Sequence, residues 1–160
     1  MEFLAQFHPI VVHFPIAFFL GYVLFEIIGA FTKKDFFSKT AHLLLFLGVL
    51  GALVAVLTGS QAEDVAQSWQ KAGNIFPAKA LSAIGEHADS ATLTLWYFFA
   101  LLVLRTYFVL KKKFTKGIKY IFIVLALVGS FFVYRTGKLG GNLVYKYGIG
   151  TEFKKMEINK

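Results

Sequence analysis

Four long apolar segments alternate with short polar ones along the chain. The apolar segments cover about residues 10–31, 41–58, 91–110 and 118–134. Each is close to the ~20 residues that an α-helix needs to cross the hydrocarbon core of a bilayer. The pattern therefore predicts an all-α integral membrane protein, an antiparallel up-down four-helix bundle over residues 1–150. We expect an external loop over residues 60–90 and a polar tail over residues 151–160.

Composition supports this class and excludes several kinds of site. The chain has 160 residues, of which 57% are hydrophobic and 16% charged, whereas soluble domains are about 45–50% apolar and about 25% charged. It contains no cysteine. Disulfides, thiolate metal sites, iron–sulfur ligation and covalent c-type haem attachment are therefore excluded.

The distribution of lysines predicts the orientation in the membrane. The first and third connections between spans are lysine-rich, with Lys33, Lys34 and Lys39 in one and Lys111, Lys112, Lys113, Lys116 and Lys119 in the other. The positive-inside rule places these connections in the cytoplasm and both termini outside. The basic C-terminal tail argues the other way. The net charge of +8 thus indicates contact with lipid, and we expect no nucleic-acid partner.

The histidines and a glycine pair gather at one end of the predicted bundle. His8 and His13 begin the first span, His87 precedes the third, and Gly140 and Gly141 follow the fourth. In an antiparallel bundle these positions share one surface, which is external in the predicted orientation. His42 stands alone at the opposite end. The sequence therefore predicts a site at one end only.

Two histidines on different helices of a bundle are what bis-imidazole ligation of a b-type haem requires. We expect His13 and His87 to be the axial pair, with His8 as a further contact. Copper or zinc bound by the same three histidines is an alternative. So is a quinone whose carbonyl groups accept hydrogen bonds. The isolated His42 argues against a second haem near the other membrane surface.

The stretch after the fourth span is predicted to be non-helical. Gly140 and Gly141 are expected to end the helix and let the chain turn back, because glycine adopts positive φ without strain. The turn would form a cap over the helix ends or a backbone platform beside a ligand. Arg135 and Lys138 would suit haem propionates or lipid phosphates.

Two further patterns concern the bundle interior. His87, Ser90 and Thr94 form a polar stripe on one helix face, which in a membrane is expected to point inward. Small residues in the second span permit either close helix packing or the approach of a flat cofactor. They are Gly48, Gly51, Ala52, Ala55 and Gly59.

Two charged residues lie inside the apolar segments. Glu26 and Arg105 fall at comparable depths, toward the lysine-rich end. An ionised carboxylate in lipid is costly unless it is paired. We therefore expect a structural ion pair between them. A carboxylate on a proton pathway is the alternative for Glu26.

Several segments together resemble a known family. HPIVVHFPIA, a second span ending in TG, a histidine before the third span and GGNLVYKYG are similar to the bacterial membrane family catalogued as domain of unknown function 2231. Glu26 stands where that family more often carries Asp. The resemblance implies a location in the bacterial cytoplasmic membrane and a respiratory setting, since relatives occur fused to or beside cytochrome c-like or Rieske-like modules.

The sequence shows no nucleophile–base pair, phosphate-binding glycine loop or nucleotide fingerprint. Hydrolase and transferase activities are therefore not expected. Our hypothesis is a small b-type cytochrome that passes electrons between membrane quinone and an external redox partner. The alternative is a non-catalytic subunit that assembles or anchors a larger membrane complex, binding a metal or lipid at the histidines.

Overall fold

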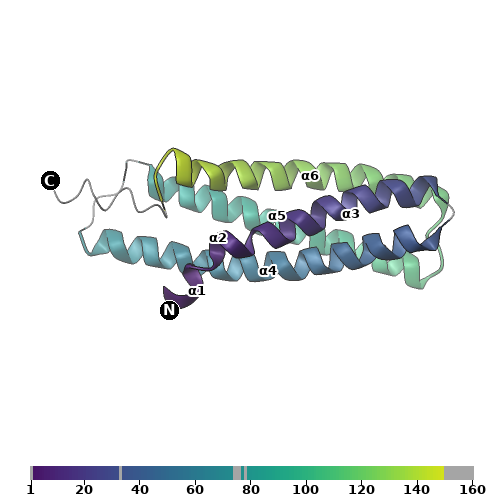
Figure 1. The fold of residues 1–160 in the computed structure, drawn as a ribbon, viewed down its shortest axis with the longest axis horizontal. Coiled ribbons are helices and arrows are strands. Elements are labelled where there is room, and N and C mark those ends of the chain that lie inside the picture. The colour runs from purple at the N-terminus through teal and green to yellow at the C-terminus, as the bar shows by residue number, and fades with distance from the viewer. Residues whose placement is uncertain (1, 33, 74–76, 78, 150–160) are drawn as a thin grey trace.

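The protein is a bundle of long helices lying side by side (Figure 1). The computed structural model describes residues 2–32, 34–73, 77 and 79–149, so the predicted tail over residues 151–160 lies outside the described part. The helices are α1 (Glu2–Ala5), α2 (His8–Val11), α3 (His13–Phe31), α4 (Asp35–Lys71), α5 (Ala80–Leu110) and α6 (Lys116–Tyr145). Within the described ranges the regular structure is entirely helical, as the apolar pattern predicts.

The first membrane-length stretch, Phe3–Phe31, combines three of these helices. The short α2 begins at His8, and Pro9 occupies its first turn. Proline is tolerated there because the N–H group that it lacks would have no intrahelical partner. Pro15 lies buried in the first turn of α3. The prolines thus mark helix starts, and they place His8 at the beginning of a helix.

The segment expected to be a loop over residues 60–90 is largely helical. α4 continues to Lys71 and α5 begins at Ala80. Residues 74–76 and 78 lie outside the described part. The polar sequence after Gly59 is rich in Gln and Ala, which are good helix formers. α4 has 37 residues, a length of about 55 Å, so its last turns extend beyond a hydrocarbon core of about 30 Å.

The last helix, α6, also extends beyond the end that was predicted for the fourth span. α6 continues to Tyr145, through the glycines that were expected to stop it. Each helical glycine costs about 1 kcal/mol relative to alanine. That cost is offset where a neighbouring side chain needs the space, as Gly140 shows below. The predicted turn at Gly140 and Gly141 was therefore wrong.

The four long helices form a closed ring of neighbours. α3 packs on α4 and α6, and α5 packs on the same two helices, so α3 and α5 face each other across the bundle axis. Their side chains meet there. The rings of Phe19 and Phe98 stack with centroids 3.8 Å apart and planes 8° from parallel.

Each of these stacked rings lies against a glycine of a neighbouring helix. A Cβ at Gly48 would stand 2.4 Å from Phe19, and one at Gly129 would stand 2.5 Å from Phe98. Such distances do not occur in real contacts, so only glycine admits the rings. The small residues of the second span therefore serve close packing at this level.

The outer surface suits lipid. Four helices are long and apolar enough to cross a membrane. Many large apolar side chains are more than half exposed on their outer faces, including Leu24, Leu57, Trp96 and Phe131. Exposed apolar area on this scale is abnormal for a soluble monomer. It is the expected surface of a helix bundle surrounded by acyl chains.

Candidate functional site

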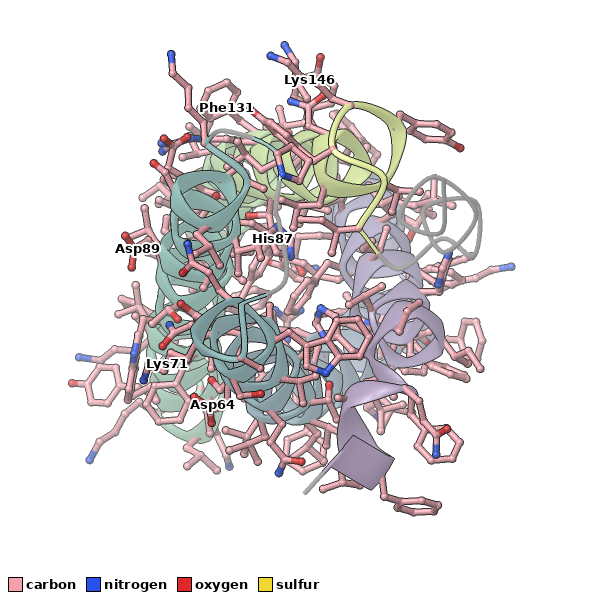
Figure 2. The ribbon with its side chains drawn as sticks, turned by 90° about the vertical axis from the view of Figure 1, so that its left-hand side faces the viewer. Asp64, Lys71, His87, Asp89, Phe131 and Lys146 are labelled. Atoms are coloured by element: carbon pink, nitrogen blue, oxygen red, sulfur yellow. The ribbon has the colours of Figure 1, made fainter. Side chains whose placement is uncertain are left out.

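Two histidines meet on the bundle axis at one end. His8, from α2, and His87, from α5, have ring centroids 6.3 Å apart and planes inclined at 72°. Both are half-buried. Figure 2 looks along the bundle and shows His87 in the middle of the helix ring. The pair joins diagonally opposite helices, as the Phe19–Phe98 stack does.

Hydrogen bonds determine the tautomer of His8. Its Nδ1 lies 3.1 Å from Oγ1 of Thr58, and that hydroxyl donates its own hydrogen to the carbonyl of Ala55 at 3.0 Å. The threonine oxygen must therefore accept from the imidazole, so Nδ1 carries the proton. The Nε2 atom of a neutral His8 then has a free lone pair.

The same holds for His87 by a different route. Its Nδ1 lies 3.2 Å from the backbone carbonyl oxygen of Thr136. A carbonyl only accepts, so Nδ1 donates here too and Nε2 keeps its lone pair. In the described part of the chain, neither Nε2 atom has a hydrogen-bond partner. The site thus presents two oriented imidazoles with the ligand tautomer that backbone or side-chain oxygens impose on metal-binding histidines.

Thr136 also anchors the polar stripe of α5. Thr94 donates to the carbonyl of Ser90 at 2.7 Å, so it accepts from the Thr136 hydroxyl at 3.0 Å. Ser90 in turn donates to Thr136 at 2.8 Å. Ser90 and Thr94 are buried. The stripe therefore points inward, and its hydroxyls bond both backbone and neighbouring side chains.

Two glycines make room for the imidazoles. A Cβ at Gly59, on α4, would stand 2.9 Å from Cε1 of His8, and one at Gly140, on α6, would stand 3.0 Å from Cε1 of His87. Both distances lie at or below the closest approach of real contacts. The two helices that carry no site histidine thus each contribute a glycine beside one ring.

The histidine pair repeats the Phe19–Phe98 layer three helical turns away. Eleven residues separate each site residue from the equivalent residue of that layer on the same span. The equivalences are His8 with Phe19, His87 with Phe98, Gly59 with Gly48 and Gly140 with Gly129. The common spacing is readable in the sequence, although sequence reasoning did not use it. It would have selected His8 rather than His13.

The structure brings together only part of the predicted site. His8, His87 and Gly140 meet, but His13 is exposed on the outer face. Five residues of α-helix rotate a side chain to about 140° from the starting direction, so His8 and His13 cannot both face the axis. Arg135 is exposed as well, and Gly141 has open space beside it.

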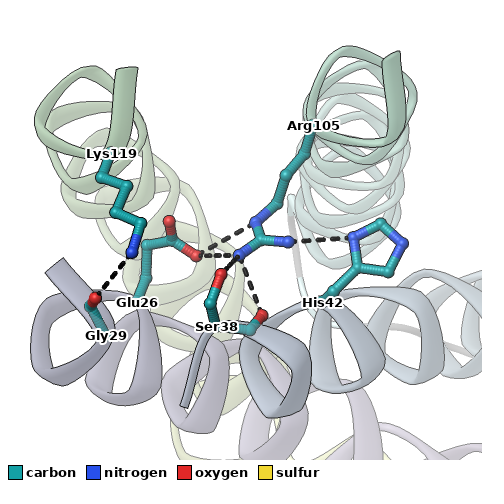
Figure 3. Close-up of polar contacts among 6 residues, drawn as sticks. All are labelled: Glu26, Gly29, Ser38, His42, Arg105 and Lys119. Atoms are coloured by element: carbon teal, nitrogen blue, oxygen red, sulfur yellow. Dashed lines mark hydrogen bonds and ion pairs between the residues drawn. The ribbon is translucent and has the colours of Figure 1, made fainter. Parts of the chain in front are cut away.

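The predicted ion pair is present at the other end. Arg105 donates from Nη2 to Oε2 of Glu26 at 2.9 Å and from Nε to the same oxygen at 3.1 Å. The two side chains are 1% and 2% exposed, so neither charge is solvated. Ser38 and His42 accept further hydrogen bonds from the guanidinium (Figure 3). His42 is therefore part of this cluster, and Lys119 closes it by donating to the carbonyl of Gly29 at 3.1 Å.

The residues that could hold a metal are few. Among the described residues, no group of three or more His, Cys, Asp or Glu side chains is placed to hold a metal ion. The histidine pair supplies two ligands. A group bound there must bring the rest of its own coordination sphere or take it from water.

The fold and the lipid-facing surface define a membrane protein built on four long apolar helices. The chain matches a family described as "Predicted membrane protein (DUF2231)" over residues 5–153 and belongs to that family. No curated protein and no solved structure matches it.

Proposed function

We propose that His8 and His87 are the axial ligands of a b-type haem and that the protein transfers electrons between membrane quinone and an external redox partner. One observation carries the proposal. Two imidazoles reach the bundle axis from diagonally opposite helices, each held through Nδ1 so that Nε2 is free.

Two histidine ligands suit a haem better than they suit a metal ion without a porphyrin. A porphyrin supplies four nitrogens, so two protein ligands complete the coordination, whereas protein zinc sites use three or four protein ligands. The ring centroids of His8 and His87 are 6.3 Å apart, so both residues would be within reach of one group held between them. Because Gly59 and Gly140 have no Cβ atom, no side chain crowds the two rings at these positions.

The surrounding residues would orient the ligands and limit water. Thr58 and the carbonyl of Thr136 hold each ring by its Nδ1–H, and such bonds also increase the basicity of Nε2. The stacked rings of Phe19 and Phe98 close the bundle axis further in, about 16 Å from the histidine pair. Haem, when bound, supplies reversible one-electron chemistry.

The location of the lysines supports an external site. Lys34 and residues 111–115, which belong to the lysine-rich connections, lie at the end of the bundle opposite the histidine pair. By the positive-inside rule this end is cytoplasmic in a bacterial membrane. His8 and His87 then face the outside, where a cytochrome c-like or Rieske-like partner would exchange electrons.

An absorbance spectrum tests the proposal. Protein expressed with added haem precursor and purified in mild detergent should show a Soret band, with a pyridine haemochrome of haem b. His8→Ala and His87→Ala should each lose the band, because bis-imidazole ligation needs both rings. His13→Ala is the matched control and should keep it. A colourless wild type, or loss of the band in His13→Ala alone, overturns the proposal.

A structural role is the competing function, and one observation favours it. The Nδ1 bonds and the glycine contacts already hold both rings in a packed arrangement without any ligand. A colourless preparation that co-purifies with other membrane subunits would support an assembly subunit. Stoichiometric copper or zinc lost in His8→Ala would instead assign a metal site.

A further inference from the structure

A groove runs along the outside of the bundle near the lysine-rich end, between α4 and α5. It has a volume of about 410 Å³ and is lined by His42, Phe46, Leu102, Val103 and Thr106. Its wall is mostly apolar, and its two polar side chains are His42 and Thr106, whose hydroxyl donates to the carbonyl of Leu102. The groove is distinct from the His8–His87 site, and the inference drawn from it does not depend on the proposed haem.

The imidazole of His42 presents a hydrogen-bond donor to its surroundings. Arg105 Nη1 lies 3.0 Å from Nδ1 of His42. A guanidinium has donors only, so Nδ1 accepts and the proton of the neutral ring is on Nε2. Figure 3 shows that this second nitrogen points away from Arg105. In the part of the chain that the structure describes, it has no hydrogen-bond partner.

An unpaired N–H beside an apolar, lipid-facing surface is unfavourable. A ligand that offers an acceptor atom at this depth, together with an apolar tail, would satisfy both parts of the groove. The acceptor group must lie at the level of His42, and the tail must follow the helices toward the bundle centre.

The apolar part is long enough for an acyl chain. A second groove shares Val103 and continues along the outer face of α5 from Tyr107 to Trp96. These twelve residues span about 16 Å of helix. Half of the ~30 Å hydrocarbon core, the depth of one leaflet, is about 15 Å. The combined groove therefore matches the chain of a lipid in the leaflet at the lysine-rich end.

The positive charge around the mouth of the groove favours a lipid with an anionic headgroup. Lys39 is exposed on α4, one helical turn from His42 toward the membrane surface. The exposed residues 111–113, all lysines, follow the end of α5. Asp35 is exposed at the start of α4, so the cations outnumber the acid. Basic pockets between helices at this membrane surface suit phosphate headgroups.

We propose that this groove binds an anionic phospholipid, with its phosphate among Lys39, His42 Nε2–H and the lysines after α5, and an acyl chain along α5. The lipid completes the hydrogen bonding of the Glu26–Arg105–His42 cluster from outside. The site would hold its lipid through detergent extraction, because the headgroup and the chain are both engaged.

Native mass spectrometry of the full-length protein tests the proposal. Protein is exchanged into nanodiscs of phosphatidylglycerol and phosphatidylcholine in equal amounts, and retained lipid is counted after release. The wild type should retain phosphatidylglycerol preferentially. Lys39→Gln should lower that preference about fivefold, since a lysine near an anionic headgroup contributes about 1 kcal/mol. Lys71→Gln, an equal charge change on an exposed residue at the other end of α4, should leave it unchanged.

The histidine is tested separately. His42→Leu should also lower phosphatidylglycerol retention, whereas His13→Leu should not. A melting curve shows whether His42→Leu folds, and if it does not, Lys39→Gln decides the question. Equal retention of both lipids by the wild type overturns the proposal. Equal effects of Lys39→Gln and Lys71→Gln overturn it too, as does displacement of phosphatidylglycerol by a quinone.

Discussion

At the scale of single residues, two neighbouring glycines of α6 have different structural roles. Gly140 gives space to the His87 ring, whereas Gly141 has nothing within contact distance of a new Cβ. Both lie inside α6, so both cost helix stability. Only Gly140 is offset by a tertiary contact. The sequence alone cannot separate the two, because the difference is which side of the helix faces His87.

The pair Gly140→Ala and Gly141→Ala measures this difference. Gly140→Ala should destabilise the protein by about 1–2 kcal/mol, because the new methyl group displaces the imidazole. Gly141→Ala should be neutral or stabilising by up to about 1 kcal/mol, since alanine is the better helix former. Thermal unfolding in detergent gives both values. Equal melting temperatures for the two variants would mean that His87 does not need the space.

At the scale of elements, diagonal contacts tie α2–α3 to α5 at three levels. The levels are His8–His87, Phe19–Phe98 and Glu26–Arg105. The ion pair was predictable, because an unpaired charge in the membrane is costly and few basic residues lie at the depth of Glu26. The Phe19–Phe98 stack was not, since the sequence has 19 phenylalanines and only packing identifies the two that meet.

Removing one partner of the ion pair should destabilise the protein much more than removing both. Arg105→Met leaves a buried carboxylate without its partner and should cost about 3–5 kcal/mol. Glu26→Leu combined with Arg105→Met should recover a large part of that loss, because no uncompensated charge remains. Unfolding measurements on the single and double variants give the coupling energy. A double variant less stable than Arg105→Met would contradict the predicted coupling between Glu26 and Arg105.

At the scale of the whole molecule, the chain reads as two similar halves. His8, Phe19 and Glu26 on the first span correspond to His87, Phe98 and Arg105 on the third, each 79 residues later. Gly48 and Gly59 correspond to Gly129 and Gly140, each 81 residues later. The residues that correspond on the first and third spans meet each other across the bundle axis. The candidate site lies on that axis.

The orientation of this axis in the membrane is testable because the chain has no cysteine. Ala72→Cys lies beyond the end of α4 at the histidine end, and Lys113→Cys lies in the lysine-rich turn at the other. A membrane-impermeant maleimide applied to intact cells should label Ala72→Cys only, if the histidine pair faces outside. Labelling of Lys113→Cys alone would place the pair, and any redox partner, on the cytoplasmic side.

Sequence patterns predicted the class of protein, the four apolar helices, the gathering of histidines at one end and the partner of Glu26. These features depend on hydrophobicity and on the order of the segments, and both can be read along the chain. The packed bundle was needed to show that His8 rather than His13 faces His87, and that Gly140 accommodates a ring instead of ending a helix. Those outcomes depend on the rotation of each helix about its own axis. That rotation is set when diagonal side chains pack against each other.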